Sequence, residues 1–235
     1  MSPSADPAPL AGAGGGDADD NGAAVSAFQR YRRPLLWSAV LILWLGSAGT
    51  GLYWLMAYDN TPGVAADAPS AWPADSALTR DPATPTLVML AHPRCDCTRA
   101  SLGELAELLA RVKFKPRTFV VFIKPGGTES GWEQSGTWEQ AKQIPGVTVV
   151  RDDDGAEARR FGVHTSGQTL LYDAHGALLY SGGTTGSRGK SGENVGRAEL
   201  VALVDGARRP RATRPVFGCP LFSHEPPAQG RGPRG

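Results

Sequence analysis

The sequence predicts an α/β domain over residues 84–222, with a sheet that is parallel at its first strands and antiparallel at its last. Short apolar runs alternate with segments of helical periodicity through most of this range. The late runs QTLLYD and ALLYSGG are joined by the turn AHG, which indicates a hairpin. A chain of 235 residues has room for one such domain with extensions.

The expected elements follow the order β-α-β-(α)-β-α-β-β-α. The first strand is TLVMLAH (86–92) and the second is RTFVVFIK (117–124). Between them, SLGELAELLARV places apolar side chains on one helical face. The later segments GWEQSGTWEQAKQI, DDDGAEARRFGV and ENVGRAELVALVDGARR are expected to hold helices, and GVTVVRD a third strand. The helical face of the first helix consists of Leu102, Leu105, Leu108, Leu109 and Val112.

The N-terminal part predicts a membrane anchor. Residues 1–33 are expected to form a disordered leader and residues 34–58 a transmembrane helix, because no charged residue occurs from Leu35 to Tyr58. A cleaved signal peptide or a buried core helix is the alternative. Arginines precede the span and aspartates follow it, so the positive-inside rule places the N-terminus in the cytoplasm and the domain in the periplasm of a bacterium, at the inner membrane.

The segments on either side of the domain are expected to be unstructured. Residues 59–83 are rich in Pro, Ala and Asp and predict a linker that acts as a spacer. Residues 223–235 predict a disordered tail. The formal net charge of +1 gives no indication of a nucleic-acid partner.

The candidate site residues lie mainly in HPRCDCTRASLGEL, residues 92–105, where the first strand is expected to meet the first helix. A helix N-terminus presents unpaired N–H groups and partial positive charge, which lower a thiol pKa. Cys95 and Cys97 are therefore predicted to be a reversible redox pair. Arg94 and Arg99 add positive charge, and His92 can transfer protons or act as a ligand.

The third cysteine, Cys219, lies in GCPLF. It could pair with Cys95 or Cys97, resolve a mixed disulfide, or be a small buried residue, and the sequence favours the last of these. Three cysteines are too few for a disulfide scaffold.

A copper site is an alternative use of the same thiols, because thiolates select soft cations such as Cu(I). Its expected ligands are Cys95, Cys97 and His92. A structural zinc site would lack one ligand unless Cys219 contributes. The other histidines are His164, which could approach the thiols, His175 in the hairpin turn and His224 in the tail.

The element order resembles that of thioredoxin-like proteins. The segments HPRCDCTRASLGEL, RRFGVHTSGQTLLYD, GALLYSGG and GCPLF resemble membrane-anchored thioredoxin-like proteins of the RedB type. This resemblance implies a three-layer fold, thiol–disulfide exchange without a cofactor and a periplasmic thiol or disulfide protein as partner. A non-catalytic interaction domain is the second alternative to this function.

The same resemblance assigns roles to the cysteines. In a thioredoxin-like arrangement the first, more exposed thiol attacks and the second resolves, which makes Cys95 the nucleophile and Cys97 its partner. Another alignment places Cys97 at the second thioredoxin cysteine and Arg94 at the first. The chain departs from thioredoxins in having C-x-C for C-x-x-C, and Gln168 where they have a cis-proline that helps to bind extended peptides.

Overall fold

The computed structural model describes residues 19–207 and 211–222, with side chains from residue 31 onward. The chain divides into two compact units, Met1–Leu55 and Met56–Gly235, and each is described by itself. His224 and the predicted tail, residues 223–235, lie outside the described residues.

Helix α1, Asp19–Asn60, contains the predicted transmembrane segment. From Tyr31 to Asn60 it is long and apolar enough to cross a membrane. Residues 1–18 of the predicted leader lie outside the described residues. Residues 19–33 of the predicted leader lie within α1. Alanine, glutamine and arginine in this stretch favour helix, which explains the longer element.

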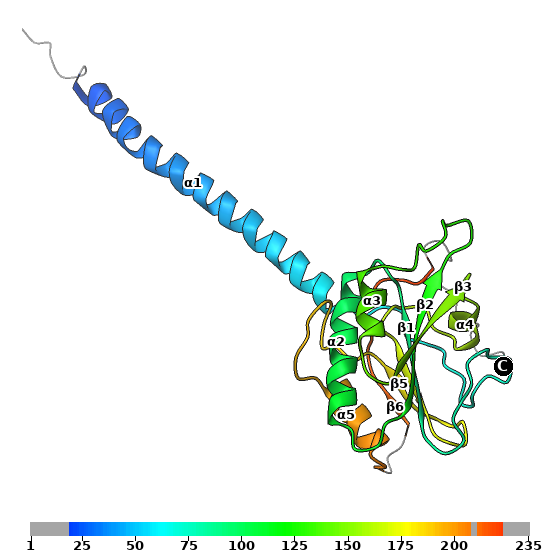
Figure 1. Cartoon of the computed structure of the whole chain (residues 1–235). Coiled ribbons are helices and arrows are strands. Elements are labelled where there is room, and N and C mark those ends of the chain that lie inside the picture. The colour runs from blue at the N-terminus through cyan, green and yellow to red at the C-terminus, as the bar shows by residue number, and fades with distance from the viewer. Residues whose placement is uncertain (1–18, 208–210, 223–235) are drawn as a thin grey trace, which may run out of the picture. The chain divides into compact units, whose positions relative to one another are not determined.

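The second unit contains a six-stranded sheet in the order β3-β2-β1-β4-β5-β6 (Figure 1). Strands β1, β2 and β3 are mutually parallel, whereas β4 runs antiparallel to both β1 and β5. Strand β6 pairs in parallel with β5. The bounds are β1 Thr86–Ala91, β2 Arg117–Lys124, β3 Val147–Asp153, β4 Thr169–Tyr172, β5 Leu178–Gly182 and β6 Ala212–Thr213.

Four helices connect these strands. Helices α2, α3 and α5 cover one face of the sheet, and α4 lies on the other face (Figure 1). The central order β5-β4-β1-β2, with β4 antiparallel to its neighbours, is the thioredoxin-like arrangement, so the predicted fold class is confirmed. The helix bounds are α2 Asp96–Arg111, α3 Gly136–Lys142, α4 Ala156–Arg160 and α5 Val195–Val204.

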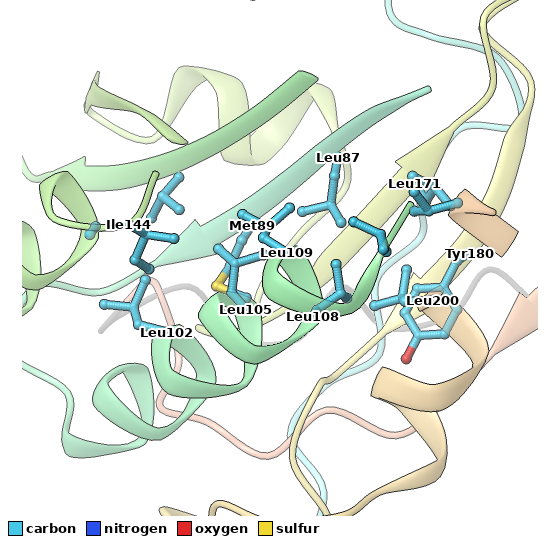
Figure 2. Close-up of a cluster of buried hydrophobic side chains, with 14 of the residues drawn as sticks. Leu87, Met89, Leu102, Leu105, Leu108, Leu109, Ile144, Leu171, Tyr180 and Leu200 are labelled. Carbon is cyan, nitrogen blue, oxygen red and sulfur yellow. The ribbon is translucent and has the colours of Figure 1, made fainter. Parts of the chain in front are cut away.

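The core between α2 and the sheet holds the site in place. Figure 2 shows the leucines of α2 packed against Leu87 and Met89 of β1, with Leu200 of α5 beside them. All five apolar residues of the predicted helical face are buried. Every residue of β1 is buried as well, because helices or loops cover both faces of this central strand. The helix that follows β1 is thereby fixed along its length.

The segment before β1 differs from the predicted spacer. It contains no regular helix or strand, but Ala68 and Leu78 are buried in the core on the α4 side of the sheet. Trp72 packs edge-on against Phe161 and Tyr172, with ring centroids 5.1 and 5.2 Å away. The prediction of a free spacer over residues 59–83 is therefore wrong for most of its length, because its apolar side chains cover a sheet face that α4 is too short to cover.

Candidate thiol site

Three cysteines that are distant in sequence meet in one place. The sulfur atoms of Cys95, Cys97 and Cys219 all lie within 4.8 Å of one another. Cys95 is the N-cap residue of α2 and Cys97 lies in the first turn of that helix. Cys219 arrives from the C-terminal segment that follows β6. All three are free thiols in the structure.

The C-terminal segment is held against the loop before β4 by backbone hydrogen bonds. The N–H of Ser166 donates to the carbonyl oxygen of Cys219, and the N–H of Leu221 donates to that of His164, each at 2.8 Å. A Cβ atom at Gly218 would lie 1.9 Å from the Ser166 carbonyl oxygen, so this close approach requires glycine. Leu221 is buried in the core. Cys219 is thus a fixed member of the site.

The thiol of Cys95 is strongly acidified. The largest cause is a hydrogen bond that the Cys219 thiol donates to the Cys95 sulfur, and backbone N–H groups of Cys219, Thr98 and Cys97 add to it. Burial works in the opposite direction, but the net result lowers the pKa of Cys95 to about 5. The sequence-based expectation of a thiolate at this helix N-terminus agrees with this direction.

The pKa values of the other two thiols, Cys97 and Cys219, are raised. Burial raises the pKa of Cys97, and the negative charge of Cys95 raises it further. The pKa of Cys219 is raised first by the hydrogen bond it donates to Cys95, which favours its protonated form, and then by burial. Arg188 partly offsets both increases. The site therefore combines one thiolate with two protonated thiols near neutral pH.

The solvent exposure of the three cysteines differs from the sequence-based expectation. Cys95 is only 3% exposed, whereas Cys97 and Cys219 are both partly exposed. The prediction that Cys95 is the more exposed thiol is wrong. The prediction that Cys219 is a buried core residue is also wrong. Both errors have one cause, since the segment that carries Cys219 lies beside Cys95 and covers it, while Cys219 itself stays partly exposed.

His92 lies beside the thiols but outside the sulfur cluster. Among the described residues, the group whose ligand atoms come together consists of the three cysteines and contains no histidine. The Nδ1 atom of His92 accepts a hydrogen bond from the Arg94 N–H at 3.2 Å, and its ring packs edge-on against Trp132. Burial is the main cause that lowers the pKa of His92. The ligand atoms that come together are therefore those of the three cysteines, and His92 is not among them.

Three more predicted site residues, Arg94, Arg99 and Gln168, differ in their burial. Arg94 is exposed with its guanidinium over the Trp132 ring, and Arg99 is exposed on α2. Gln168 is buried, and its Nε2 donates to the Ser181 hydroxyl at 3.0 Å. The backbone carbonyl oxygen of Gln168 accepts a hydrogen bond from the Leu90 N–H at 2.9 Å. This bond continues the pairing of β1 and β4 toward the site.

The other two described histidines take no part in the sulfur cluster. His164 is exposed, with its ring centroid 6.4 Å from that of Phe222. His175 is exposed in the hairpin turn, as the sequence predicts, and its N–H donates to the Asp173 carboxylate at 2.9 Å.

A hydroxyl pair that sequence reasoning missed ties the two sides of the site together. The hydroxyl of Thr98 donates to the His92 carbonyl oxygen and lies 2.8 Å from the hydroxyl of Ser166. Ser166 also accepts from the His92 N–H at 2.9 Å. Ser166 belongs to the TSGQ segment that carries part of the family resemblance, and this is the one signal that could have identified it.

The glycine-rich loop after β5 also contributes, although the sequence gives it no defined role. The Arg188 guanidinium donates to the Gly218 carbonyl oxygen at 2.5 Å and to the Tyr58 carbonyl oxygen at 3.2 Å. A backbone N–H at Gly189 faces the Cys97 sulfur and favours its thiolate. At the far end of the loop, Glu104 and Arg197 form a buried ion pair at 2.6 Å.

Comparisons with known proteins come from solved structures. The sequence matches no protein-family model and no curated protein. A hypothetical protein from Sinorhizobium meliloti aligns with a TM-score of 0.46 and 21% identity, over 68% of this chain and 93% of that one. An uncharacterised protein from Geobacillus kaustophilus aligns with a TM-score of 0.46 and 18% identity, over 72% and 95%. A secreted Mycobacterium tuberculosis disulfide oxidoreductase homologous to E. coli DsbE aligns with a TM-score of 0.36 and 16% identity, over 53% and 82%.

Proposed function

We propose that this chain is a membrane-tethered thiol–disulfide exchange protein that works through the cluster of Cys95, Cys97 and Cys219. The observation that supports this most strongly is the meeting of three sulfurs within 4.8 Å, one of them at a helix N-terminus. A thiolate is the reactive form in disulfide exchange, and a neighbouring thiol within reach can close or resolve a disulfide. These are the components that exchange chemistry requires.

The setting of the domain is part of the same proposal. The apolar helix Tyr31–Asn60 serves as a single membrane anchor, with the cytoplasm on its N-terminal side and the periplasm on the side of the domain. Disulfide chemistry persists in such oxidising compartments. The H-P-x-C-x-C stretch and the TSGQ segment support placing the chain with the RedB type of tethered thioredoxin-like proteins. The partner is a periplasmic protein that carries a thiol or a disulfide.

The test uses the purified full chain in detergent. Incubation with oxidised glutathione, alkylation of free thiols and peptide mass spectrometry should show a reversible disulfide that includes Cys95. Cys95→Ala should abolish thiol–disulfide exchange with a dithiol reporter peptide. If all three thiols remain free in the oxidising buffer and the reporter is not exchanged, the exchange function is refuted, and the domain is then better explained as an interaction module.

A Cu(I) site is the second candidate function, and the cluster of three sulfurs favours it over the two-thiol set expected from the sequence. Thiolates select Cu(I), and three sulfurs within 4.8 Å can surround one ion at metal–sulfur distances of about 2.3 Å, as measured for zinc. Cys95, Cys97 and Cys219 would hold the ion. Anaerobic Cu(I) titration against a competing chelator should then give one ion per chain. Cys219→Ser should weaken binding and His92→Ala should not, whereas equal affinity in the Cys219→Ser protein would refute the site.

A further inference from the structure

The burial of the three thiols differs in a way that fixes the direction of the proposed reaction. We propose that the oxidised domain holds a Cys95–Cys219 disulfide, that a substrate thiolate attacks the sulfur of Cys219, and that Cys95 departs as the leaving thiolate. The domain is then an oxidant of thiols. This inference rests on the exchange function proposed above, and it adds the bond that is attacked and the direction of electron flow.

The disulfide is assigned to Cys95 and Cys219 because their sulfurs lie within 4.8 Å of each other on two separate segments of the chain. Cys97 also donates a hydrogen bond to the Cys95 sulfur, but the hydrogen bond from Cys219 has the larger effect on that sulfur. Cys95 and Cys97 instead lie two residues apart at the start of one helix. A bridge between them would close a short ring across the start of α2, where the backbone changes from the extended conformation of Cys95 to helix.

Access decides which sulfur of the bridge is attacked. Cys95 is 3% exposed, whereas Cys219 is partly exposed. A thiolate from another molecule must approach the sulfur that it attacks, so it can reach Cys219 and is kept from Cys95. The opposite reaction, in which Cys95 attacks a disulfide of a partner protein, would require that disulfide to enter the space that the segment carrying Cys219 occupies.

The position of Cys95 makes it the better leaving group. As the N-cap of α2 it faces the N–H groups of Thr98 and Cys97, which stabilise the thiolate that departs. A thiol of low pKa leaves faster, and a disulfide whose reduced form is stabilised is a stronger oxidant.

The electrons and bonds balance over two exchanges. In the first, the Cys95–Cys219 bond breaks, the substrate sulfur bonds to Cys219, and Cys95 keeps the electron pair. In the second, another substrate thiolate attacks the sulfur of the first, Cys219 departs and takes a proton from solvent. Two substrate thiols are thereby oxidised to one disulfide, and the domain gains two electrons. A disulfide-bearing partner protein of higher reduction potential restores the bridge by the same exchange.

The experiment uses the oxidised full chain in detergent. The protein is mixed briefly with reduced glutathione, quenched in acid, alkylated and digested for mass spectrometry. We expect glutathione attached to Cys219 and the alkylating group on Cys95. Glutathione on Cys95 or Cys97 would overturn the inference while leaving exchange intact, whereas a complete lack of adducts and of reduction would count against the proposed function itself.

Two matched variants test the bridge directly. Cys97→Ser should still form the Cys95–Cys219 disulfide in an oxidising glutathione buffer, and Cys219→Ser should lose it. If Cys97→Ser loses the disulfide, the bridge includes Cys97 and the assignment is wrong.

Discussion

Replacement of Cys219 by alanine should raise the pKa of Cys95 by one to two units. The thiol of Cys219 donates the hydrogen bond that contributes most to the lowering of this pKa. A hydrogen bond to a charged group contributes about 1.5–3 kcal/mol, and one pKa unit corresponds to about 1.4 kcal/mol. The pKa should therefore move from about 5 to between about 6 and 7.

The assay is ultraviolet absorbance of the thiolate as a function of pH, measured in a Cys97→Ser background. In this background Cys95 is the thiol that titrates below neutral pH, because the pKa of Cys219 is raised. His92 and Arg188, the ionisable side chains beside the cluster, are the same in both proteins. Cys219→Ser keeps an O–H donor and should give a smaller shift. A pKa that stays at about 5 in the alanine variant would refute the role of Cys219.

Three further predictions concern the support of the site. Gly218→Ala pushes a Cβ atom to within 1.9 Å of facing backbone and should cost about 1–3 kcal/mol in urea unfolding, whereas Gly186→Ala, which meets nothing within 4 Å, should be neutral. Arg197→Ala leaves the carboxylate of Glu104 buried without its cation, so the free energy of unfolding should fall by about 3–5 kcal/mol; a loss below about 1 kcal/mol would contradict this. The pKa of Cys95 is lower in the folded than in the unfolded protein, so its thiolate stabilises the fold fully above about pH 9. This contribution to the free energy of unfolding should decrease toward pH 5 by about 1.4 kcal/mol per pH unit. The Cys95→Ala protein should lack this pH dependence.

The fold could be predicted from the sequence because local periodicity determines it. The apolar run at 117–124 coincides with β2, and the leucines of the first helical pattern are the ones that pack on β1. The hairpin turn AHG likewise joins β4 and β5. In these places the hydrophobic pattern, the turn residues and the packing agree, which is the condition under which sequence patterns specify structure.

The site could be predicted only in part, because contacts between distant segments complete it. The spacing C-x-C and the strand–helix junction were visible in the sequence, and both lie where expected. The pairing of residues 164–166 with the C-terminal segment has no local signature, so neither the position of Cys219 nor the burial of Cys95 could be anticipated. The ion pair of Glu104 with Arg197 was missed for the same reason, since the two residues lie on different helices and far apart in the sequence.

The position of Cys219 near the C-terminal end of the domain has a consequence for biosynthesis. In the proposed orientation the segment after the anchor crosses the membrane in chain order, so Cys95 and Cys97 reach the oxidising compartment before the residues around Cys219. During that interval the two neighbouring cysteines are the thiols available for oxidation, either by each other or by small disulfides. The proposed Cys95–Cys219 bridge would form only after the last residues of the domain have arrived, and any earlier bond would have to be replaced by thiol exchange.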